Sequence, residues 1–416
     1  MAVGATPTTI VIPTQRVYIV MKRNLLLILG LVALCQSASA QLYYQDSKSP
    51  DILHHTACTP VERRNIVIPD VNGYKVFKAD LHTHTFFSDG HLSPDMRIRE
   101  AWIDGLDIMA ITDHLEWRKF EPDMLKFLRG YVPKGTKPVN YAISKTIADE
   151  NGIKVDLNAP FYGLQKSLNY YGIMVIRGIE VTRRPELYGH FNALFTKDNN
   201  TIYDDDPEQS ILKARSQGAI IMHNHPGWSR KSLEMHEFEQ RVYEKGLIDG
   251  IEIMNTNEFY PKAIDRAKQY GFFMAASTDI HNTTADFYLN GQIRNMTLIL
   301  ANECTEEGVR EALGARRTIA YSFGTMAGDE SLLRALFEAC VSAEEVLVRP
   351  DGKRLIRLVN KSSLTFVLKA EGQREITLSP LAEQNHMITS DTLTFTVENM
   401  WHGSDSRLAV CITPKK

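Results

Sequence analysis

The sequence predicts an α/β protein, in which a TIM-like barrel of about seven strand–helix units precedes a small C-terminal all-β module. From Tyr74, short β-type runs alternate with helix-type segments, which is typical of parallel strands joined by helices. Near Ala343 the apolar residues change to a period of two, with polar turns between the runs. With 416 residues, 44% of them hydrophobic and 23% charged, the composition excludes collagen, coiled coils and low-complexity disorder.

The barrel is expected over residues 74–330, after an N-terminal extension over 41–73. Its predicted strands are residues 76–81, 107–111, 173–179, 191–195, 219–222, 250–254, 273–277 and 296–300. Its predicted helices are residues 94–104, 207–217, 233–245, 261–270 and 306–315. Residues 117–172 are rich in Pro, Lys, Asn and Tyr and fit no single helix. We expect them to be an insertion over the mouth of the barrel, where lids and substrate loops often lie.

The C-terminal module is expected over residues 343–416 as a β-sandwich-like domain. The period-two runs are residues 353–359, 363–368, 375–378, 392–397 and 408–412. Several closely spaced strands without intervening helices are typical of a small sandwich.

The first forty residues differ from the rest and predict a leader. From Met21, a basic stretch at residues 22–24 precedes an apolar run over 25–34, and small residues at 38–40 form a cleavage site. This is the pattern of a secretory signal peptide, and its apolar run is too short for a membrane anchor, the alternative interpretation. Lipid attachment at Cys35 is the weaker alternative, because a bulky leucine precedes that cysteine. The mature protein is expected to be exported, periplasmic or secreted, without a stable membrane span.

The net charge argues against one class of partner, and the cysteine content leaves the disulfide pairing open. The 47 Lys and Arg residues against 50 Asp and Glu residues give a net charge of −3, so long duplex nucleic acid is not an expected partner. Signal cleavage would leave Cys58, Cys304, Cys340 and Cys411, which allow three disulfide connectivities that the sequence leaves open. The sequence also leaves the oligomeric state open.

Histidines and carboxylates recur where the predicted strands end. His82 and His84 follow the first strand, and side chains two residues apart share one face of a strand, so both can bind the same ion. The carboxyl ends of barrel strands converge on one rim, so residues distant in sequence meet there. The further members of this predicted metal site are Asp89, His114, Glu180, His190, His225, Asp279 and His281.

This ordered set resembles the PHP superfamily, named for polymerase and histidinol phosphatase, over about residues 76–325. The motifs that carry the resemblance are Asp-Leu-His-Thr-His at 80–84, Thr-Asp-His at 112–114, Glu180, His-Pro at 225–226 and Asp-Ile-His at 279–281. The resemblance implies a distorted seven-stranded βα barrel with a trinuclear metal centre at its rim. The amidohydrolase superfamily also opens with His-x-His, but its bridging lysine and lone final aspartate fit this chain less well.

The resemblance also implies a ligand for each ion. The first ion would be held by His82, His84, Glu180 and Asp279, the second by Glu180 as a bridge with His190 and His225, and the third by Asp89, His114 and His281. His225 is preferred to His223 because a proline follows it, and Asp89 is preferred to His91 because a carboxylate matches the family's spacing. The expected cofactors are two to three divalent ions, with Mn, Zn and Fe all compatible with mixed imidazole and carboxylate ligands.

The expected reaction is hydrolysis of a small-molecule phosphate ester by a hydroxide that bridges two ions. Asp279, His281 and Glu180 are the expected catalytic residues, with Asp279 or a neighbouring histidine moving a proton. The expected substrate-binding residues are Arg183, Arg184 and Arg230 for the phosphate and Trp228 for the organic group.

Three functions remain open from the sequence. Exported chains with a His-Pro-Gly-Trp stretch, as at residues 225–228, and a β tail resemble a secreted phosphodiesterase branch of the family. The nearest alternative is a phosphomonoesterase that acts on histidinol phosphate, nucleotides or sugar phosphates. A non-catalytic, metal-containing binding protein is the alternative of a different class.

Overall fold

The computed structural model describes residues 50–51, 62–118, 156–162, 164, 171–184, 187–288 and 291–415. The predicted leader over 1–40 and most of the predicted insertion over 117–172 lie outside the described residues. Residues 61–416 form one compact unit. Among the described residues, no helix combines the length and the apolar character needed to cross a membrane.

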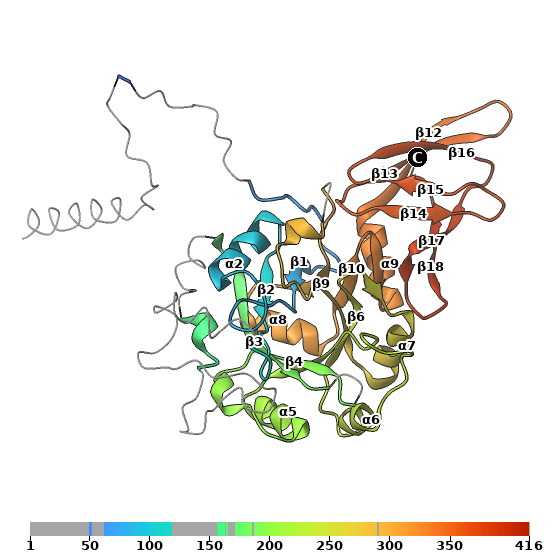
Figure 1. Ribbon diagram of the computed structural model, residues 1–416. Helices are drawn as coiled ribbons and strands as arrows, with labels where there is room; N and C mark the ends of the chain where they lie inside the picture. The colour runs from blue at the N-terminus through green and yellow to red at the C-terminus, as the bar shows by residue number, and fades with distance from the viewer. Residues whose placement is uncertain are drawn as a thin grey trace, which may run out of the picture. The chain divides into compact units, whose positions relative to one another are not determined.

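One large mixed sheet dominates this unit, which confirms the predicted α/β class (Figure 1). The strands in its barrel-like part are β1 (Lys75–Asp80), β2 (Ile108–Ile111), β3 (Met174–Thr182), β4 (His190–Leu194), β5 (Ile220–Asn224), β6 (Gly250–Asn255), β7 (Glu258–Phe259), β8 (Phe273–Ser277), β9 (Met296–Ala301), β10 (Thr318–Ser322) and β11 (Thr325–Gly328). Their spatial order is β11-β10-β9-β1-β2-β3-β4-β5-β6-β7, with β8 also paired to β6.

The sheet is not a uniform series of parallel βα units. Strands β1, β2 and β3 are parallel, and so are β5, β6 and β8, but β4 runs antiparallel to both of its neighbours. Strand β9 runs antiparallel to β1 and β10. A strand that follows its neighbour through a short turn, as β4 follows β3, pairs antiparallel because no helix carries the chain back across the sheet.

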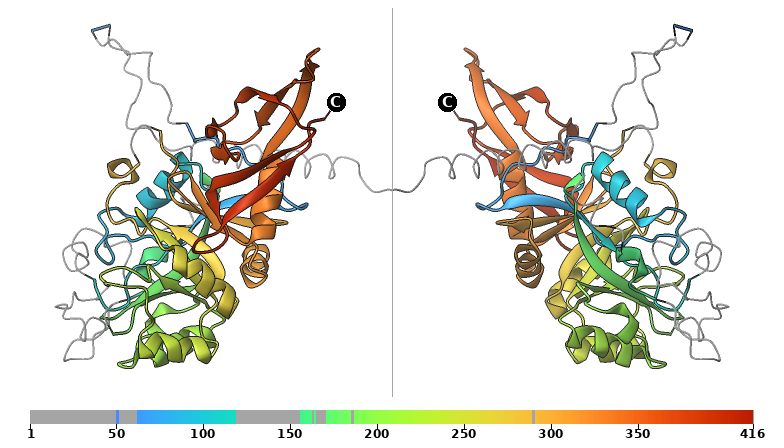
Figure 2. Two further views of the ribbon diagram at one scale, coloured as in Figure 1. Left: turned by 90° about the vertical axis from the view of Figure 1, so that its right-hand side faces the viewer. Right: turned by 90° about the vertical axis from the view of Figure 1, so that its left-hand side faces the viewer.

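Helices pack against the curved sheet (Figures 1 and 2). They are α2 (Pro94–Ile103), α5 (Pro207–Ser216), α6 (Glu237–Glu244), α7 (Pro261–Tyr270), α8 (Glu306–Gly314) and α9 (Glu330–Cys340). Helices α2, α5 and α7 each have proline in the first turn, where a missing N–H costs no hydrogen bond. Helix α6 begins four residues later than predicted, because the Glu239 carboxylate accepts a hydrogen bond from the His236 backbone N–H and fixes the start there.

The chain segments that follow β1 and β8 meet at the carboxyl ends of these two strands. There the Asp279 N–H donates to the His82 carbonyl (2.9 Å), and the His84 N–H donates to the Ile280 carbonyl (3.2 Å). Within the strands themselves, β8 also contacts β9 and β10 through threonine hydroxyls. For example, Thr297 Oγ1 accepts a hydrogen bond from the Ala276 N–H at 3.0 Å. Among the described residues no strand ladder pairs β8 with β9, β10 or β1, so closure of the barrel stays a prediction. Hydrogen bonds do join the segments after β1 and β8 at one rim.

The C-terminal residues form two groups of strands. Strands β12 (Val341–Val348), β13 (Arg354–Asn360) and β16 (Glu383–Ile388) make a separate antiparallel sheet. Strands β14 (Phe366–Lys369), β15 (Ile376–Leu378), β17 (Leu393–Trp401) and β18 (Arg407–Ile412) join the large sheet, because β17 pairs in parallel with β11. Strand β16 was missed because its residues Glu383 to Ile388 are mostly polar and exposed, and so lack a period-two apolar pattern.

The C-terminal strands and the barrel-like part share one apolar core. Phe366 of β14 is fully buried, and its ring packs edge to face on Phe337 of α9, with ring centroids 5.3 Å apart. The same cluster contains Leu298 of β9 and Leu358 of β13. The C-terminal strands therefore stabilise α9 and the sheet next to it.

Phe366→Ala is expected to lower the free energy of unfolding by about 3–5 kcal/mol, because the substitution removes a fully buried ring and leaves a cavity. Urea unfolding of residues 41–416, followed by circular dichroism, measures this loss. Phe366→Leu, which keeps most of the apolar volume, should cost about 1.5 kcal/mol or less. Equal, small losses for both variants would contradict the shared core.

Candidate metal centre

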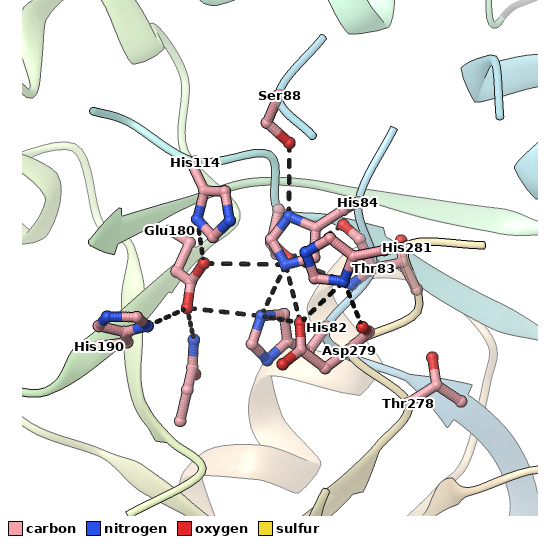
Figure 3. Close-up of polar contacts among 12 residues, drawn as sticks. His82, Thr83, His84, Ser88, His114, Glu180, His190, Thr278, Asp279 and His281 are labelled. Atoms are coloured by element: carbon pink, nitrogen blue, oxygen red, sulfur yellow. Dashed lines mark hydrogen bonds and ion pairs between the residues drawn. The ribbon is translucent and has the colours of Figure 1, made fainter. Parts of the chain in front are cut away.

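Nine predicted side chains converge on the rim at the carboxyl ends of β1 and β8. Figure 3 shows most of this centre, with Glu180 and Asp279 facing the histidines. His82 and His84 follow β1, His114 follows β2, Glu180 lies in β3, and Asp279 follows β8. The clusters that have metal-ligating atoms within 4.8 Å of one another are His84, Asp89, His114 and His281; His82, His225 and Asp279; His82, His84 and Glu180; and Glu180, His190 and His225. The structure thus brings together every residue of the predicted ligand set.

Glu180 lies at the middle of this centre and is fully buried. Its Oε1 lies 3.3 Å from His190 Nδ1 and 3.6 Å from His225 Nε2. Its Oε2 lies 2.5 Å from His114 Nδ1 and 3.7 Å from His84 Nε2. The two oxygens therefore face different groups of histidines, which is the geometry that a bridging carboxylate requires.

Asp279 connects the ends of β1 and β8. Its Oδ1 lies 2.9 Å from His84 Nε2 and 3.2 Å from His82 Nε2, while its Oδ2 lies 3.7 Å from His225 Nε2. Asp279 has a φ of 52°, and His225 has a φ of 23°. Non-glycine residues adopt this left-handed region at a cost of about 1–3 kcal/mol, so the surrounding contacts must hold both residues in place.

Asp89 forms the centre of a third group, nearer the solvent. Its Oδ1 lies 3.2 Å from His281 Nε2, 3.3 Å from His114 Nε2 and 4.0 Å from His84 Nδ1. The His281 side chain is 35% exposed, which makes it the most accessible histidine of the centre. Asp89 therefore lies at the solvent-facing edge of the centre, whereas Glu180 is fully buried within it.

Hydrogen bonds outside the centre orient the rings for metal binding. His82 Nδ1 donates to Glu252 Oε1 (3.1 Å), and His190 Nε2 donates to the Arg183 carbonyl (2.9 Å). Each ring then points its other nitrogen at the centre. His82 Nε2 and His84 Nε2 face each other at 3.0 Å beside the Asp279 carboxylate. Imidazole nitrogens and carboxylate oxygens gathered this closely are the donor set that divalent metal ions prefer, so these residues fit such ions.

The charges in the centre shift its pKa values in opposite directions. Burial tends to raise the pKa of Glu180, but the neighbouring imidazoles of His114 and His82 hold it well below its usual value. Burial also tends to raise the pKa of Asp89, and His114 likewise keeps that pKa low. The pKa of His84 is lowered to about 4 by burial and by His281 and His114, so His84 is neutral at pH 7. Ionised carboxylates and a neutral imidazole are the forms that bind metals. Burial tends to lower the pKa of His82 and His114, but Asp279 and Asp89 raise it above its usual value, so a metal bound there would displace a proton.

The sequence interpretation missed two residues that position the ligands. Glu252 of β6 is fully buried; its Oε1 binds His82, and its Oε2 accepts from the His225 N–H (2.7 Å). Arg97 of α2 is also fully buried and donates to the carbonyls of His84 (3.0 Å) and His281 (3.1 Å). A glutamate inside an apolar strand was a signal for Glu252, whereas nothing in the sequence around Arg97 sets it apart from a surface arginine.

The two histidines that the sequence interpretation ranked lower lie away from the centre. His223 Nδ1 lies 2.5 Å from the Tyr243 hydroxyl, and its Nε2 lies 3.1 Å from Glu239 Oε1. His91 is exposed and belongs to none of the four metal-type clusters found in the described residues. Their positions agree with the preference for His225 and Asp89.

A cavity of about 830 Å³ opens above the centre and is lined by Asp89, His281 and Trp228 among other residues. Arg183 and Arg184 also line it, as the sequence interpretation expects of phosphate-binding residues. The Arg183 Nε lies 3.0 Å from Glu116 Oε1, and burial raises the pKa of Glu116 to about 7 although Arg183 opposes that shift. Arg183 is therefore held in place by a buried carboxyl group.

Arg230 is not at the cavity. Its guanidinium binds both oxygens of Glu239, at 2.6 and 3.0 Å, and its side chain is only 6% exposed. The structure does not bring Arg230 to the other expected substrate-binding residues. Sequence proximity to His225 was misleading, because the chain turns away from the rim after Trp228.

Comparison with known proteins gives the family. The PHP domain matches residues 80–250. A crystal structure of a two-domain protein from Bacteroides vulgatus, containing a predicted PHP-like metal-dependent phosphoesterase, is 30% identical, with a TM-score of 0.72 over 85% of this chain and 99% of that chain. This chain belongs to the PHP family. The match to this two-domain relative covers 85% of this chain, so the structural similarity is not limited to the residues that the PHP domain matches.

More distant structures resemble this PHP protein weakly. A putative metal-dependent phosphoesterase from Bifidobacterium adolescentis is 14% identical, with a TM-score of 0.35 over 57% of this chain and 96% of that chain. A lesion-specific endonuclease from Pyrococcus furiosus is 16% identical, with a TM-score of 0.34 over 61% of this chain and 59% of that chain. The search of curated proteins gave no match.

Glu180→Gln is expected to remove more bound metal than Asp89→Asn, because Glu180 belongs to two of the metal-type clusters and Asp89 to one. Elemental analysis of both purified variants, after identical metal loading and dialysis, measures the metal per chain. Unchanged circular dichroism serves as the control for folding. Equal losses in the two variants would contradict a bridging position for Glu180.

Glu252→Ala is expected to weaken metal binding by about 10- to 100-fold, because His82 loses the acceptor that fixes its ring. Competition with a metallochromic chelator measures the affinity. Glu258→Ala, which removes an exposed carboxylate of the neighbouring strand β7, is the matched control and should change little. If both variants bind metal like the parent protein, Glu252 does not position His82.

Proposed function

We propose that this PHP protein is an exported metal-dependent phosphoesterase and that its preferred substrates are phosphodiesters. The observation that carries the proposal is the complete set of nine converging ligand side chains beneath a cavity that also exposes two arginines. The relative from Bacteroides vulgatus, described as a predicted metal-dependent phosphoesterase, supports the same class of reaction. Export rests on the signal-peptide pattern in residues 1–40.

We further propose three ions in this centre. His82, His84, Glu180 and Asp279 would hold the first, Glu180, His190 and His225 the second, and Asp89, His114 and His281 the third. His84 faces both Asp279 and Asp89, through its two ring nitrogens, so it lies between the first and third positions. Metals bound there would supply a nucleophile at neutral pH and positive charge around the phosphorus.

The chain's own side chains would bind the substrate and move protons. Arg183, held by Glu116, and the exposed Arg184 would bind the phosphate oxygens from the open side of the cavity. His281 would hold the third ion with its Nε2, because its Nδ1 donates to the Asp279 backbone carbonyl (2.8 Å). The departing alcohol would take its proton from Asp279, which would first accept the proton that the attacking water releases. Asp279 would keep the centre negatively charged and accept protons released there.

A diester preference follows from the compartment and the open cavity. Histidinol phosphate is a cytoplasmic biosynthetic intermediate that an exported enzyme rarely meets. A cavity of about 830 Å³ has room for organic groups on both sides of a phosphate. The intact ligand set argues against a non-catalytic binding protein, because such a protein has no need to keep nine metal-type side chains together.

The test is hydrolysis by the metal-loaded protein, residues 41–416, of bis(4-nitrophenyl) phosphate and 4-nitrophenyl phosphate, compared by kcat/KM. We expect faster turnover of the diester and loss of at least about 100-fold in Glu180→Gln, which disturbs two metal-type clusters. A monoester preference would make the protein a phosphatase. No turnover of either ester with a full complement of metal would contradict the phosphoesterase function.

A further inference from the structure

We infer that the substrates of this site carry a flat aromatic group, which binds against Trp228, Phe287 and Trp117 at the mouth of the cavity. This substrate class rests on the proposed phosphoesterase function and goes beyond it. The three side chains are large and apolar, yet they are 46%, 43% and 38% exposed, respectively. All three line the cavity above the metal centre.

The aromatic side chains are carried on loops that also carry predicted ligands. Trp117 lies three residues after His114, and Trp228 lies three residues after His225. Phe287 follows β8 on the segment that carries His281. Exposed apolar residues scattered singly need no explanation, but three around one cavity mark a binding surface.

Trp228 places this surface directly beside the metal centre. Its ring centroid lies 5.4 Å from that of His225 and 5.5 Å from that of His190. A ring bound against Trp228 would therefore lie next to a phosphate held at the Glu180 side of the centre. The aromatic surface and the metal centre are close enough for one ligand to contact both.

The Trp228 loop is fixed before any ligand binds. The Trp228 N–H donates to the His225 carbonyl at 2.9 Å, and the buried ion pair of Arg230 with Glu239 holds the next turn. At Gly227 a side chain would meet the Tyr260 ring at 2.6 Å, so the backbone approaches that ring closely. A rigid aromatic platform binds a ligand with little loss of conformational freedom.

The Phe287 segment is held in a similar way. The Phe287 N–H donates to the Thr284 carbonyl (3.1 Å), and the Thr284 N–H donates to the partly buried Glu100 carboxylate (2.6 Å). Phe287 is thus presented from a fixed turn on the His281 side of the cavity. Two supported aromatic side chains on separate loops can contact the same flat group.

The remaining properties of the cavity fit a phosphate ester of an aromatic group. Its volume of about 830 Å³ falls in the range that holds drug-sized ligands, so a phosphate leaves much of it free. Arg183 and Arg184 supply positive charge to the phosphate within the same cavity. Aromatic rings stack on indole and phenyl rings more favourably than alkyl groups do.

The test is titration calorimetry of the metal-loaded protein with phenyl phosphate and ethyl phosphate, which differ in the organic group alone. We expect phenyl phosphate to bind about tenfold more tightly, the gain typical of one stacked ring. Trp228→Ala or Phe287→Ala should reduce this ratio to about threefold or less, whereas Trp228→Phe should keep most of it. Leu212→Ala, which removes an exposed apolar side chain of α5, is the control and should leave the ratio unchanged.

Ethyl phosphate binding checks that each variant keeps its fold and its metal centre. Equal affinities for the two ligands in the parent protein, or a ratio unchanged in both alanine variants, would overturn the inference. Thymidine 5′-phosphate carries its ring on a sugar, whereas phenyl phosphate carries its ring directly on the phosphate. The tighter binder of the two shows which kind of aromatic ester the site takes. Tight binding of phenyl phosphate without turnover of any ester would instead contradict the proposed function and leave the aromatic site in place.

Discussion

The hydrogen bonds that join the segment after β8 to the segment after β1 are the constraint on which the site depends. They place Asp279 beside His82 and His84, although almost two hundred residues separate these positions in sequence. The buried Arg97 strengthens the same junction by donating to the carbonyls of His84 and His281. Without this junction the carboxyl ends of β1 and β8 would separate. Asp279 would then move away from His82 and His84, and the clusters of metal-type side chains would come apart.

Electrostatics explain why the centre is built from pairs of carboxylates and imidazoles. A fully buried carboxylate such as Glu180 is unstable unless positive charge or hydrogen-bond donors surround it. Five imidazoles face Glu180, and the Asn224 amide donates to its Oε1 at 2.9 Å. Glu252 and the Arg183 carbonyl hold the outer ring nitrogens of His82 and His190, so the inner nitrogens of both rings face Glu180. This arrangement has a strong preference for cations at its centre.

Much of the fold and most of the site could be predicted from the sequence, because both depend on local patterns. Apolar runs marked the strands, and polar residues at strand ends marked the rim, where His82, Glu180 and Asp279 meet. The antiparallel direction of β4 could not be predicted, because pairing direction depends on tertiary packing rather than on periodicity. Glu252 and Arg97 were missed because their burial comes from distant segments, and Arg230 was misplaced because a turn after Trp228 redirects the chain.

Anomalous X-ray diffraction from crystals of residues 41–416 loaded with Mn²⁺ tests the central claim most directly, because it locates ions independently of any substrate. The predicted result is anomalous density at Glu180, between the His82 and His190 sides, with further density beside Asp89. Ordered density for the nine side chains with manganese bound only elsewhere, or not bound at saturating concentration, would contradict a metal centre at this rim.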